Sequence, residues 1–279
     1  MKRNNQKRLL TLAVAFAFGT FTSNLWAQQK CTGPTGEVVT NPGDFACGTG
    51  ASATGGKSSA VGYKSSASGY ESSSFGYKDK VSSAGSSAFG SLNTIYANAT
   101  DSNALGDHNK VGVSGGAGTY SHANAVGSYN TASNNYASAF GYKNVASGRY
   151  GSVAFGVRNT ASGVTAVAVG IGNNATGFGS TAVGGGNTAG YGSAFGNSNT
   201  ANGNASSALG SRNTASGDYS IAAGAINQSI GFESTAIGFK NYAMVDKAVA
   251  VGYINFASGD RSSADGMLQT GEGVTSIRQ

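Results

Sequence analysis

The sequence predicts an all-β protein: a single-chain parallel β-solenoid of about 15 coils, built on a 14-residue repeat. A four-residue pattern of polar residue, alanine, apolar residue and glycine recurs down the chain, as in Ser59-Ala60-Val61-Gly62 and Ser138-Ala139-Phe140-Gly141. The closing glycines recur at a spacing of 14 in ten of the fourteen intervals between Gly62 and Gly266. A fixed period of this kind is the signature of a repeat architecture.

The composition excludes an ordinary globular domain. Glycine contributes 45 of the 279 residues and charged residues make up 11%, whereas average proteins have roughly 7% and 25%. Without the period, this composition would indicate a flexible low-complexity segment. A disordered linker has no reason to place an apolar residue once in every repeat, so the period favours a folded rod.

Residues 1–27 have the pattern of a secretory signal peptide. Basic residues at positions 2, 3, 7 and 8 precede an apolar run from Leu9 to Phe21 that leads to Ala27. The run is too short to cross a membrane. Removing these four charges lowers the formal net charge from +6 to +2, and the remaining charges are scattered along the sequence without a basic stripe. We therefore expect no nucleic-acid partner.

Residues 28–50 contain the only two cysteines, Cys31 and Cys47. In an exported protein two nearby cysteines most often pair. A loop of this length closed by a disulfide is stabilised by about 3 kcal/mol. We expect a disulfide-pinned N-terminal cap over the first coil, since the end coil of a solenoid exposes its core and backbone edge. A redox-active or intermolecular pair is the alternative.

The repeats run over residues 51–266 and consist of two halves. The alanine–apolar–glycine half is followed by an Asn-x-Ala-x-Gly half, as in Asn144-Val145-Ala146-Ser147-Gly148. We interpret each half as a short strand followed by a turn marked by Gly or Asn, the residues that tolerate positive φ. Stacked coils would pair as parallel strands about 4.8 Å apart. Residues 267–279 leave the repeat and form a short tail.

Successive strand residues point to opposite faces of a strand. A coil with so short a repeat is narrow, so we expect the recurrent alanines inside and the apolar residues that follow them outside. The outward residues would form an apolar stripe suited to contact between subunits in a side-by-side homotrimer. The stripe consists of Phe75, Phe89, Leu105, Val126, Phe140, Phe155, Val169, Val183, Phe195, Leu209, Ile237 and Val251. Alternation alone leaves the reverse open, with the apolar residues inside and the alanines outside.

The period breaks by two residues or more at three places. The interval is 16 from Gly90 to Gly106 and 21 from Gly106 to Gly127, with the additional residues of the second interval expected within 107–120. The interval from Gly184 to Gly196 is 12. Insertions in solenoids form surface loops, often on a binding face. A neutral insertion is an equal alternative.

No catalytic constellation is evident, so we expect no enzyme activity, no cofactor, no metal site and no small-molecule substrate. The two histidines lack a patterned partner, zinc-ligand spacing is absent, and the acidic residues are spread singly. The surface offers a repeated turn that suits weak multivalent contact with an extended partner. It contains Tyr63, Lys64, Tyr77, Lys78, Tyr142 and Lys143. The alternative is that the tyrosine rings stack and stabilise the turns.

The pattern Ser-x-Ala-[Val/Ile/Phe]-Gly followed by Asn-x-Ala-x-Gly at a period of 14 resembles the YadA-like head repeats of trimeric autotransporter adhesins, over roughly residues 51–266. The resemblance implies a left-handed β-roll, trimerisation, exposure at a bacterial cell surface or outer membrane, and adhesion to host matrix, cells or other bacteria. We find neither a heptad run nor a series of long alternating strands, the patterns of the family's stalk and anchor, so the mode of anchoring stays open. The alternative is a structural or matrix rod without a specific receptor.

Overall fold

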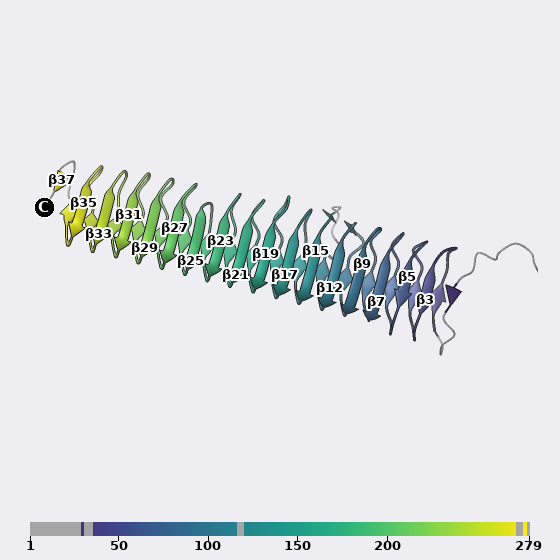
Figure 1. The fold of residues 1–279 in the computed structure, drawn as a ribbon. Helices are drawn as coiled ribbons and strands as arrows, with labels where there is room; N and C mark the ends of the chain where they lie inside the picture. Colours follow the sequence, from purple (N-terminus) through teal and green to yellow (C-terminus); the bar gives the residue numbers. More distant parts are fainter. Residues whose placement is uncertain (1–28, 31–35, 116–119, 272–275, 278–279) are drawn as a thin grey trace, which may run out of the picture.

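The computed structural model describes residues 29–30, 36–115, 120–271 and 276–277. These residues form a parallel β-solenoid of about 16 coils stacked into a straight rod (Figure 1). Strands and turns account for the described residues, and no helix occurs among them. The predicted all-β solenoid is confirmed.

Each regular coil contributes one long strand and one short strand, and equivalent strands of successive coils pair in parallel. The sheet that we call the long-strand sheet contains β1 (Gln29–Lys30), β3 (Phe45–Cys47), β5 (Ser59–Val61), β7 (Ser73–Tyr77), β9 (Ser87–Ser91), β12 (Asn103–Asp107), β15 (Asn124–Ser128), β17 (Ser138–Tyr142), β19 (Val153–Val157), β21 (Val167–Ile171), β23 (Thr181–Gly185), β25 (Ser193–Asn197), β27 (Ser207–Ser211), β29 (Ile221–Ala225), β31 (Thr235–Phe239), β33 (Val249–Tyr253), β35 (Ser263–Met267) and β37 (Ser276–Ile277).

The short-strand sheet forms the opposite wall of the rod. It contains β2 (Val38–Val39), β4 (Ser52–Ala53), β6 (Ser66–Ala67), β8 (Lys80–Val81), β10 (Thr94–Ile95), β13 (Lys110–Val111), β16 (Thr131–Ala132), β18 (Val145–Ala146), β20 (Thr160–Ala161), β22 (Asn174–Ala175), β24 (Thr188–Ala189), β26 (Thr200–Ala201), β28 (Thr214–Ala215), β30 (Gln228–Ser229), β32 (Tyr242–Ala243), β34 (Phe256–Ala257) and β36 (Thr270–Gly271).

Two turns close each coil, and they form the two edges of the rod. We call the side where a long strand turns into the next short strand the first-turn edge; in the coil of β17 this turn is Lys143 and Asn144. The second-turn edge is the side where a short strand leads to the long strand of the next coil, through residues 147–152 after β18. Because equivalent turns stack, each position of the repeat forms its own row along the rod.

The register of the ladders keeps like residues together. Ala139 pairs with Ala125 on one side and Ala154 on the other, and Phe140 is aligned in the same way with Val126 and Phe155. Every pair of strands from β12 to β33 in the long-strand sheet continues this register, alanine against alanine and glycine against glycine. A constant period thus converts a sequence repeat into continuous rows of identical side chains.

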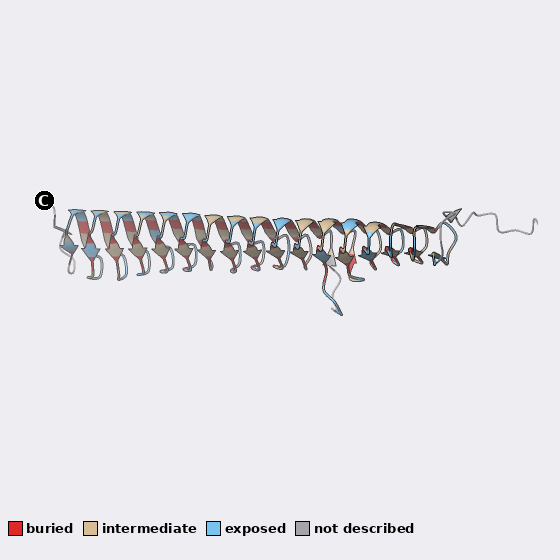
Figure 2. Ribbon diagram, turned by 90° about the horizontal axis from the view of Figure 1, so that it is seen from below, coloured by how far each residue is buried: buried red, intermediate tan, exposed pale blue. Residues whose placement is uncertain are grey.

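The core between the two sheets is made almost entirely of alanine. The repeat alanines, such as Ala60, Ala139 and Ala236, have no exposed surface, whereas the residue after each of them faces outward. Buried residues alternate with more exposed ones along each long strand (Figure 2). The alternative arrangement, with the apolar residues inside, is therefore wrong. The inward position of the long strands holds alanine, or serine at Ser74, and the few larger buried apolar side chains, Val81, Ile95 and Val111, lie on short strands.

The glycines that follow the apolar residues lie in the long strands. The expectation from the sequence, which placed them in the turns, is wrong. Gly141 is the fourth residue of β17 and has a φ of 115°. A Cβ at this position would overlap the carbonyl oxygen of Gly156 in the next coil. The positive-φ residue of the turn itself is Lys143, with a φ of 55°. Glycine is thus required for close stacking of the backbones, and the chain turns at a residue with a side chain.

The breaks in the period fall at the second-turn edge. The two lengthened turns follow β10 and β13, and within them β11 (Ala99–Thr100) and β14 (Tyr120–Ser121) pair as a small separate sheet. A segment projects from the rod at this level (Figure 2). Residues 107–111 keep the regular ladder, so the additional residues follow β13. The shortened interval removes residues only from the turn between β24 and β25, around Tyr191.

The ladders extend beyond residues 51–266 at both ends. The expected cap contributes β1, β2 and β3, which pair in register with β3, β4 and β5, and β35 pairs with β37 in the expected tail. Cys47, at the end of β3, is disulfide-bonded. Cys31 and the predicted signal peptide, residues 1–27, lie outside the described residues, so the pairing with Cys31 and the cleavage stay predictions.

We expect Ala139→Val to destabilise the rod, because two added methyl groups have no space between the stacked Ala125 and Ala154. Overpacking of this kind costs typically about 1–3 kcal/mol, measured as a lower urea midpoint. The control is Ser138→Val, whose side chain faces outward where the next coil already has Val153. Equal midpoints for the two variants would contradict the alanine core.

Candidate functional site

The outer face of the long-strand sheet carries the apolar stripe, and its members occupy one position of the register from β7 to β33. Phe89, Leu105, Phe155, Phe195, Leu209 and Ile237 are exposed, with Phe155 at 55%. Phe75, Val126, Phe140, Val169, Val183 and Val251 are partly exposed. Two rungs depart from the pattern, since Ala223 and Asp265 occupy the same row.

Neighbouring residues widen the stripe at several levels of the rod. Val153 and Val157 flank Phe155 on β19, and the next strand places Ile171 in the outer row, 65% exposed. Aromatic rings on the stripe contact each other along the rod; the rings of Phe75 and Phe89 stack with centroids 5.0 Å apart. The face is therefore a continuous apolar surface and not a set of isolated side chains.

Directly behind the stripe, at the first-turn edge, runs a ladder of buried asparagines. In Asn144 the backbone N–H and the side-chain Nδ2 both donate to Oδ1 of Asn130, at 3.0 and 3.1 Å. Nδ2 also lies 2.8 Å from the Phe140 carbonyl oxygen and 2.7 Å from the Gly156 carbonyl oxygen of the next coil. One side chain thus links three consecutive coils.

The asparagine ladder is continuous over twelve coils, and its members are fully buried. They are Asn93, Asn109, Asn130, Asn144, Asn159, Asn173, Asn187, Asn199, Asn213, Asn227, Asn241 and Asn255. Each donates to the carbonyl of the residue four positions earlier, which from Phe89 to Val251 is the stripe position. The ladder therefore holds the backbone of the stripe in place from within.

The sequence interpretation assigned these asparagines to turns with positive φ, and this was wrong. The positive-φ residue is the one before each asparagine, such as Lys143 or Arg158. A signal was present: glycine never replaces asparagine in this row, although it would suit positive φ better. Next to the asparagines the row contains Ser65, Asp79 and Gln269, which have hydrogen-bonding side chains, and beyond Ser65 it continues with Ala51 and Glu37.

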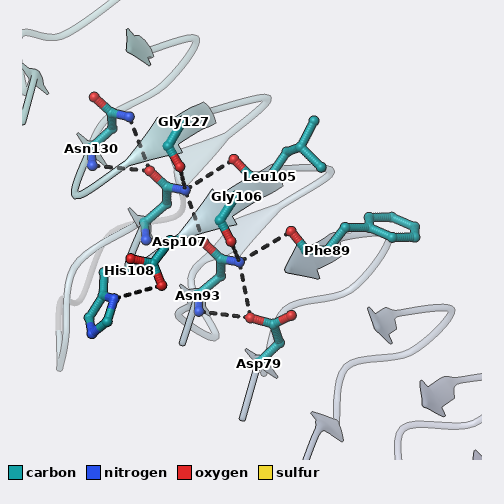
Figure 3. A network of polar contacts seen from close by, with 10 residues as sticks. Asp79, Phe89, Asn93, Leu105, Gly106, Asp107, His108, Gly127 and Asn130 are labelled. Carbon is teal, nitrogen blue, oxygen red and sulfur yellow. Dashed lines mark hydrogen bonds and ion pairs between the residues drawn. The ribbon is translucent and has the colours of Figure 1, made fainter. Parts of the chain in front are cut away.

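Asp79 is the acidic residue that directly adjoins the asparagines in this row (Figure 3). Its Oδ1 accepts hydrogen bonds from the backbone N–H and Nδ2 of Asn93, at 2.8 and 3.0 Å, as an asparagine oxygen would. Its Oδ2 is buried and has no hydrogen-bond partner. Burial raises the pKa of Asp79; hydrogen bonds from Asn93 and from the backbone of Gly90 oppose this shift, and the charge of Asp107 adds to it. The neutral carboxyl group suits the site better than the carboxylate.

Asp44 shows the opposite balance. Burial acts to raise the pKa of Asp44, but hydrogen bonds from the backbone N–H and hydroxyl of Ser58 and from Asn41 outweigh it and lower the pKa. A carboxylate is therefore well accommodated where both oxygens find donors, as they do at Asp44. The contrast indicates that the pKa of Asp79 is raised because its buried Oδ2 has no hydrogen-bond donor.

The predicted tyrosine–lysine turns lie exposed at the first-turn edge. The Nζ atoms of Lys64, Lys78 and Lys143 lie 5.3, 4.9 and 5.1 Å from the ring centroids of the tyrosines that precede them. The rings of Tyr63 and Tyr77 also stack on each other, 5.4 Å apart. These contacts stabilise the turns, which was the alternative to ligand binding. A role of these residues in ligand binding stays a prediction.

Within the described residues, no group of three or more His, Cys, Asp or Glu side chains could hold a metal ion. No helix in this part of the chain is long and apolar enough to cross a membrane. Asp107 and His108 form an isolated contact, Oδ1 to Nδ1 at 2.8 Å, at the surface of the ladder (Figure 3).

Comparison with family models matches the YadA head domain repeat to residues 46–65, 53–78, 132–156, 150–173, 188–213, 201–225 and 246–264. These segments of the chain are YadA head domain repeats. These repeats belong to the trimeric autotransporter adhesins, and the family and the solenoid fold together indicate a structural protein. No curated protein matches the chain.

We expect Asn173→Ala to destabilise the head strongly, since it leaves the carbonyls of Val169 and Gly184 and the N–H of Asn187 without their partners. Each buried group left unpaired costs about 1–3 kcal/mol. The adjacent Asn174 faces outward, and Asn174→Ala should change stability by less than about 0.5 kcal/mol. Chemical denaturation of both variants is the measurement. A similar loss of stability in both variants would show that the asparagine ladder does not stabilise the rod.

The raised pKa of Asp79 predicts a pH dependence of stability. The folded state holds this proton more tightly than the unfolded state, so the contribution is complete below the unfolded pKa and is lost as pH rises through the folded pKa. Asp79→Asn should therefore be more stable than the parent at pH 7 and should lack this loss. Urea midpoints between pH 3 and pH 8 measure both curves. The variant Asp107→Asn controls for the neighbouring charge and should retain most of the dependence.

Proposed function

We propose that the chain is the head of an exported surface adhesin, in which three copies pack side by side through the apolar stripe. The observation that carries this proposal is the exposed apolar row that runs in register from Phe75 to Val251. A row of this length is a liability for a monomer. A closed symmetric oligomer would bury it, and the YadA head family, whose members are trimeric, supports the number three.

Export is supported by two features of the N-terminal region. Residues 1–27 have the order of charges and apolar residues of a signal peptide. Cys47 is disulfide-bonded, and disulfides persist in oxidising compartments outside the cytoplasm. We place the head at the bacterial cell surface or outer membrane, or in the extracellular medium.

The rod would attach to a partner through many copies of the same surface residues. Each copy presents the same rows of side chains many times along the rod, so a long partner such as host matrix or another cell surface could be held at many weak contacts. The exposed turns with Tyr63, Lys64, Tyr77, Lys78, Tyr142 and Lys143 are our candidates for such contacts. Saturable binding of the purified chain to immobilised matrix proteins or to cells tests this. Its absence on every surface would favour a structural rod without a receptor.

Sedimentation equilibrium tests the trimer. The parent should have three times the mass of the chain, and Phe155→Asp should lower this mass or aggregate the protein, because it places a charge in a buried apolar contact. The control is Phe178→Asp, at the second-turn edge, where the ring is 71% exposed; this variant should remain trimeric. A parent chain that sediments as a monomer would refute the proposed packing.

A further inference from the structure

We propose that the first-turn edge of the rod binds a linear sulfated polysaccharide. The inference deepens the proposed adhesive function, since it names a class of partner for the head. It starts from the lysines and arginines of the described repeat region, residues 51–271, which number twelve. Eight of them lie in the first turns or at the first position of the short strands beside them, and all eight are exposed. They are Lys64, Lys78, Lys80, Lys110, Lys143, Arg158, Arg212 and Lys240.

Negative charge is almost absent from this edge. Apart from the buried Asp79, the only acidic residue in these positions is Asp107, which contacts His108 at 2.8 Å. Among the described residues, no carboxylate forms an ion pair with any of the eight cations. The edge therefore presents a row of positive charges that no side chain of the described repeats neutralises.

The second-turn edge has a different charge. It carries four cations, Lys57, Arg149, Lys247 and Arg261, and six acidic residues, Glu71, Asp101, Asp218, Glu233, Asp246 and Asp260. Ion pairs form there, between Lys57 and Glu71 at 3.2 Å and between Lys247 and Glu233 at 3.7 Å. The sequence-based expectation that no basic stripe exists is thus wrong, because charges scattered along the chain are sorted by their position within the period.

The dimensions of the row suit an extended chain. Lys64 and Lys240 follow β5 and β31, which are twelve steps apart in the long-strand sheet. At about 4.8 Å for each step, the row is about 58 Å long. Cations on neighbouring coils, such as Lys64 and Lys78 or Lys143 and Arg158, are about 5 Å apart. An extended polymer that carries anionic groups along its length can follow such a row past turns without a cation, as at Gly172, Gly186 and Ser198, whereas a compact anion reaches only neighbouring coils.

A second copy of the chain does not supply the missing negative charge. Residues 108–217 contain five cations and no aspartate or glutamate. Copies packed side by side in parallel would bring equal levels of the rod together, so Lys143 and Arg158 would meet no acidic residue of a neighbour. The partner must therefore be a different molecule.

The aromatic residues of the edge favour a polysaccharide over a single-stranded nucleic acid. Nucleic-acid surfaces of this kind offer free aromatic faces on which bases stack. Here the rings of Tyr63, Tyr77 and Tyr142 are already engaged by Lys64, Lys78 and Lys143, and Tyr63 stacks on Tyr77. These contacts hold the ammonium groups in place for charge-assisted hydrogen bonds to sulfate oxygens.

The test is retention of the purified chain on immobilised heparin, with affinity measured as a function of salt. The first variant combines Lys64→Gln, Lys78→Gln, Lys143→Gln and Arg158→Gln. The matched control combines Lys57→Gln, Arg149→Gln, Lys247→Gln and Arg261→Gln at the other edge, with the same change of net charge. We expect Kd at physiological salt to rise at least about tenfold in the first variant and less than about twofold in the control. The slope of log K against log salt should fall by up to about four, roughly one for each cation removed.

Equal losses in the two variants would show attraction by net charge alone and would overturn the inference, as would failure of the parent chain to bind. Competition by hyaluronate as strong as that by heparin would remove the requirement for sulfate. Tighter binding of single-stranded DNA or of anionic lipid vesicles would replace the polysaccharide as the partner. The oligomeric mass is measured on the same samples, so a monomer that binds heparin through this edge would refute the trimer and leave this inference standing.

Discussion

The stacking of buried asparagines is the interaction on which the rest of the rod depends. At each first turn the chain reverses within two residues, and the carbonyls at the end of the long strand would be left without donors. Asn144 satisfies them with one side chain, which reaches its own coil and both neighbours. Buried away from water, such a network is strong when every member is satisfied and costly when one is not. The uniform row of asparagines follows from that condition, and Asp79 is the acidic residue at one end of it.

Because the coil is narrow, the large side chains lie on the surface of the rod, and the functional contacts are made there. Alanine at the inward position of the long strands and glycine where backbones meet leave little interior volume, and Phe140 and its equivalents face outward. In a globular domain these residues would form the core. In this rod they form a surface for contact, and the turns between strands display the charged and aromatic residues. In a fold with so little interior, the rows of exposed side chains are the surfaces that can contact a partner.

Much of this arrangement could be predicted from the sequence. The period of 14 implied the solenoid, and the alternation around Ala139, together with the small width of the coil, implied that Phe140 faces outward. The role of Asn144 was missed, since an asparagine beside a turn is ordinarily interpreted by its backbone preference and not by its side-chain bonds. Gly141 was assigned to a turn for the same reason: a linear pattern does not show that the next coil passes over that residue.

What the sequence by itself determined is the repeat, and with it the register, the alanine core and the apolar row, because each of these is a property of a single position in the period. What only the tertiary structure decided is which positions from different coils share an edge. Lys80 and Arg158 are separated by several complete coils of the chain, yet stacking places both on one side of the rod. The charge of a surface depends on which residues lie close together in the folded rod and not on their order in the sequence. The basic edge is therefore visible only in the stacked coils.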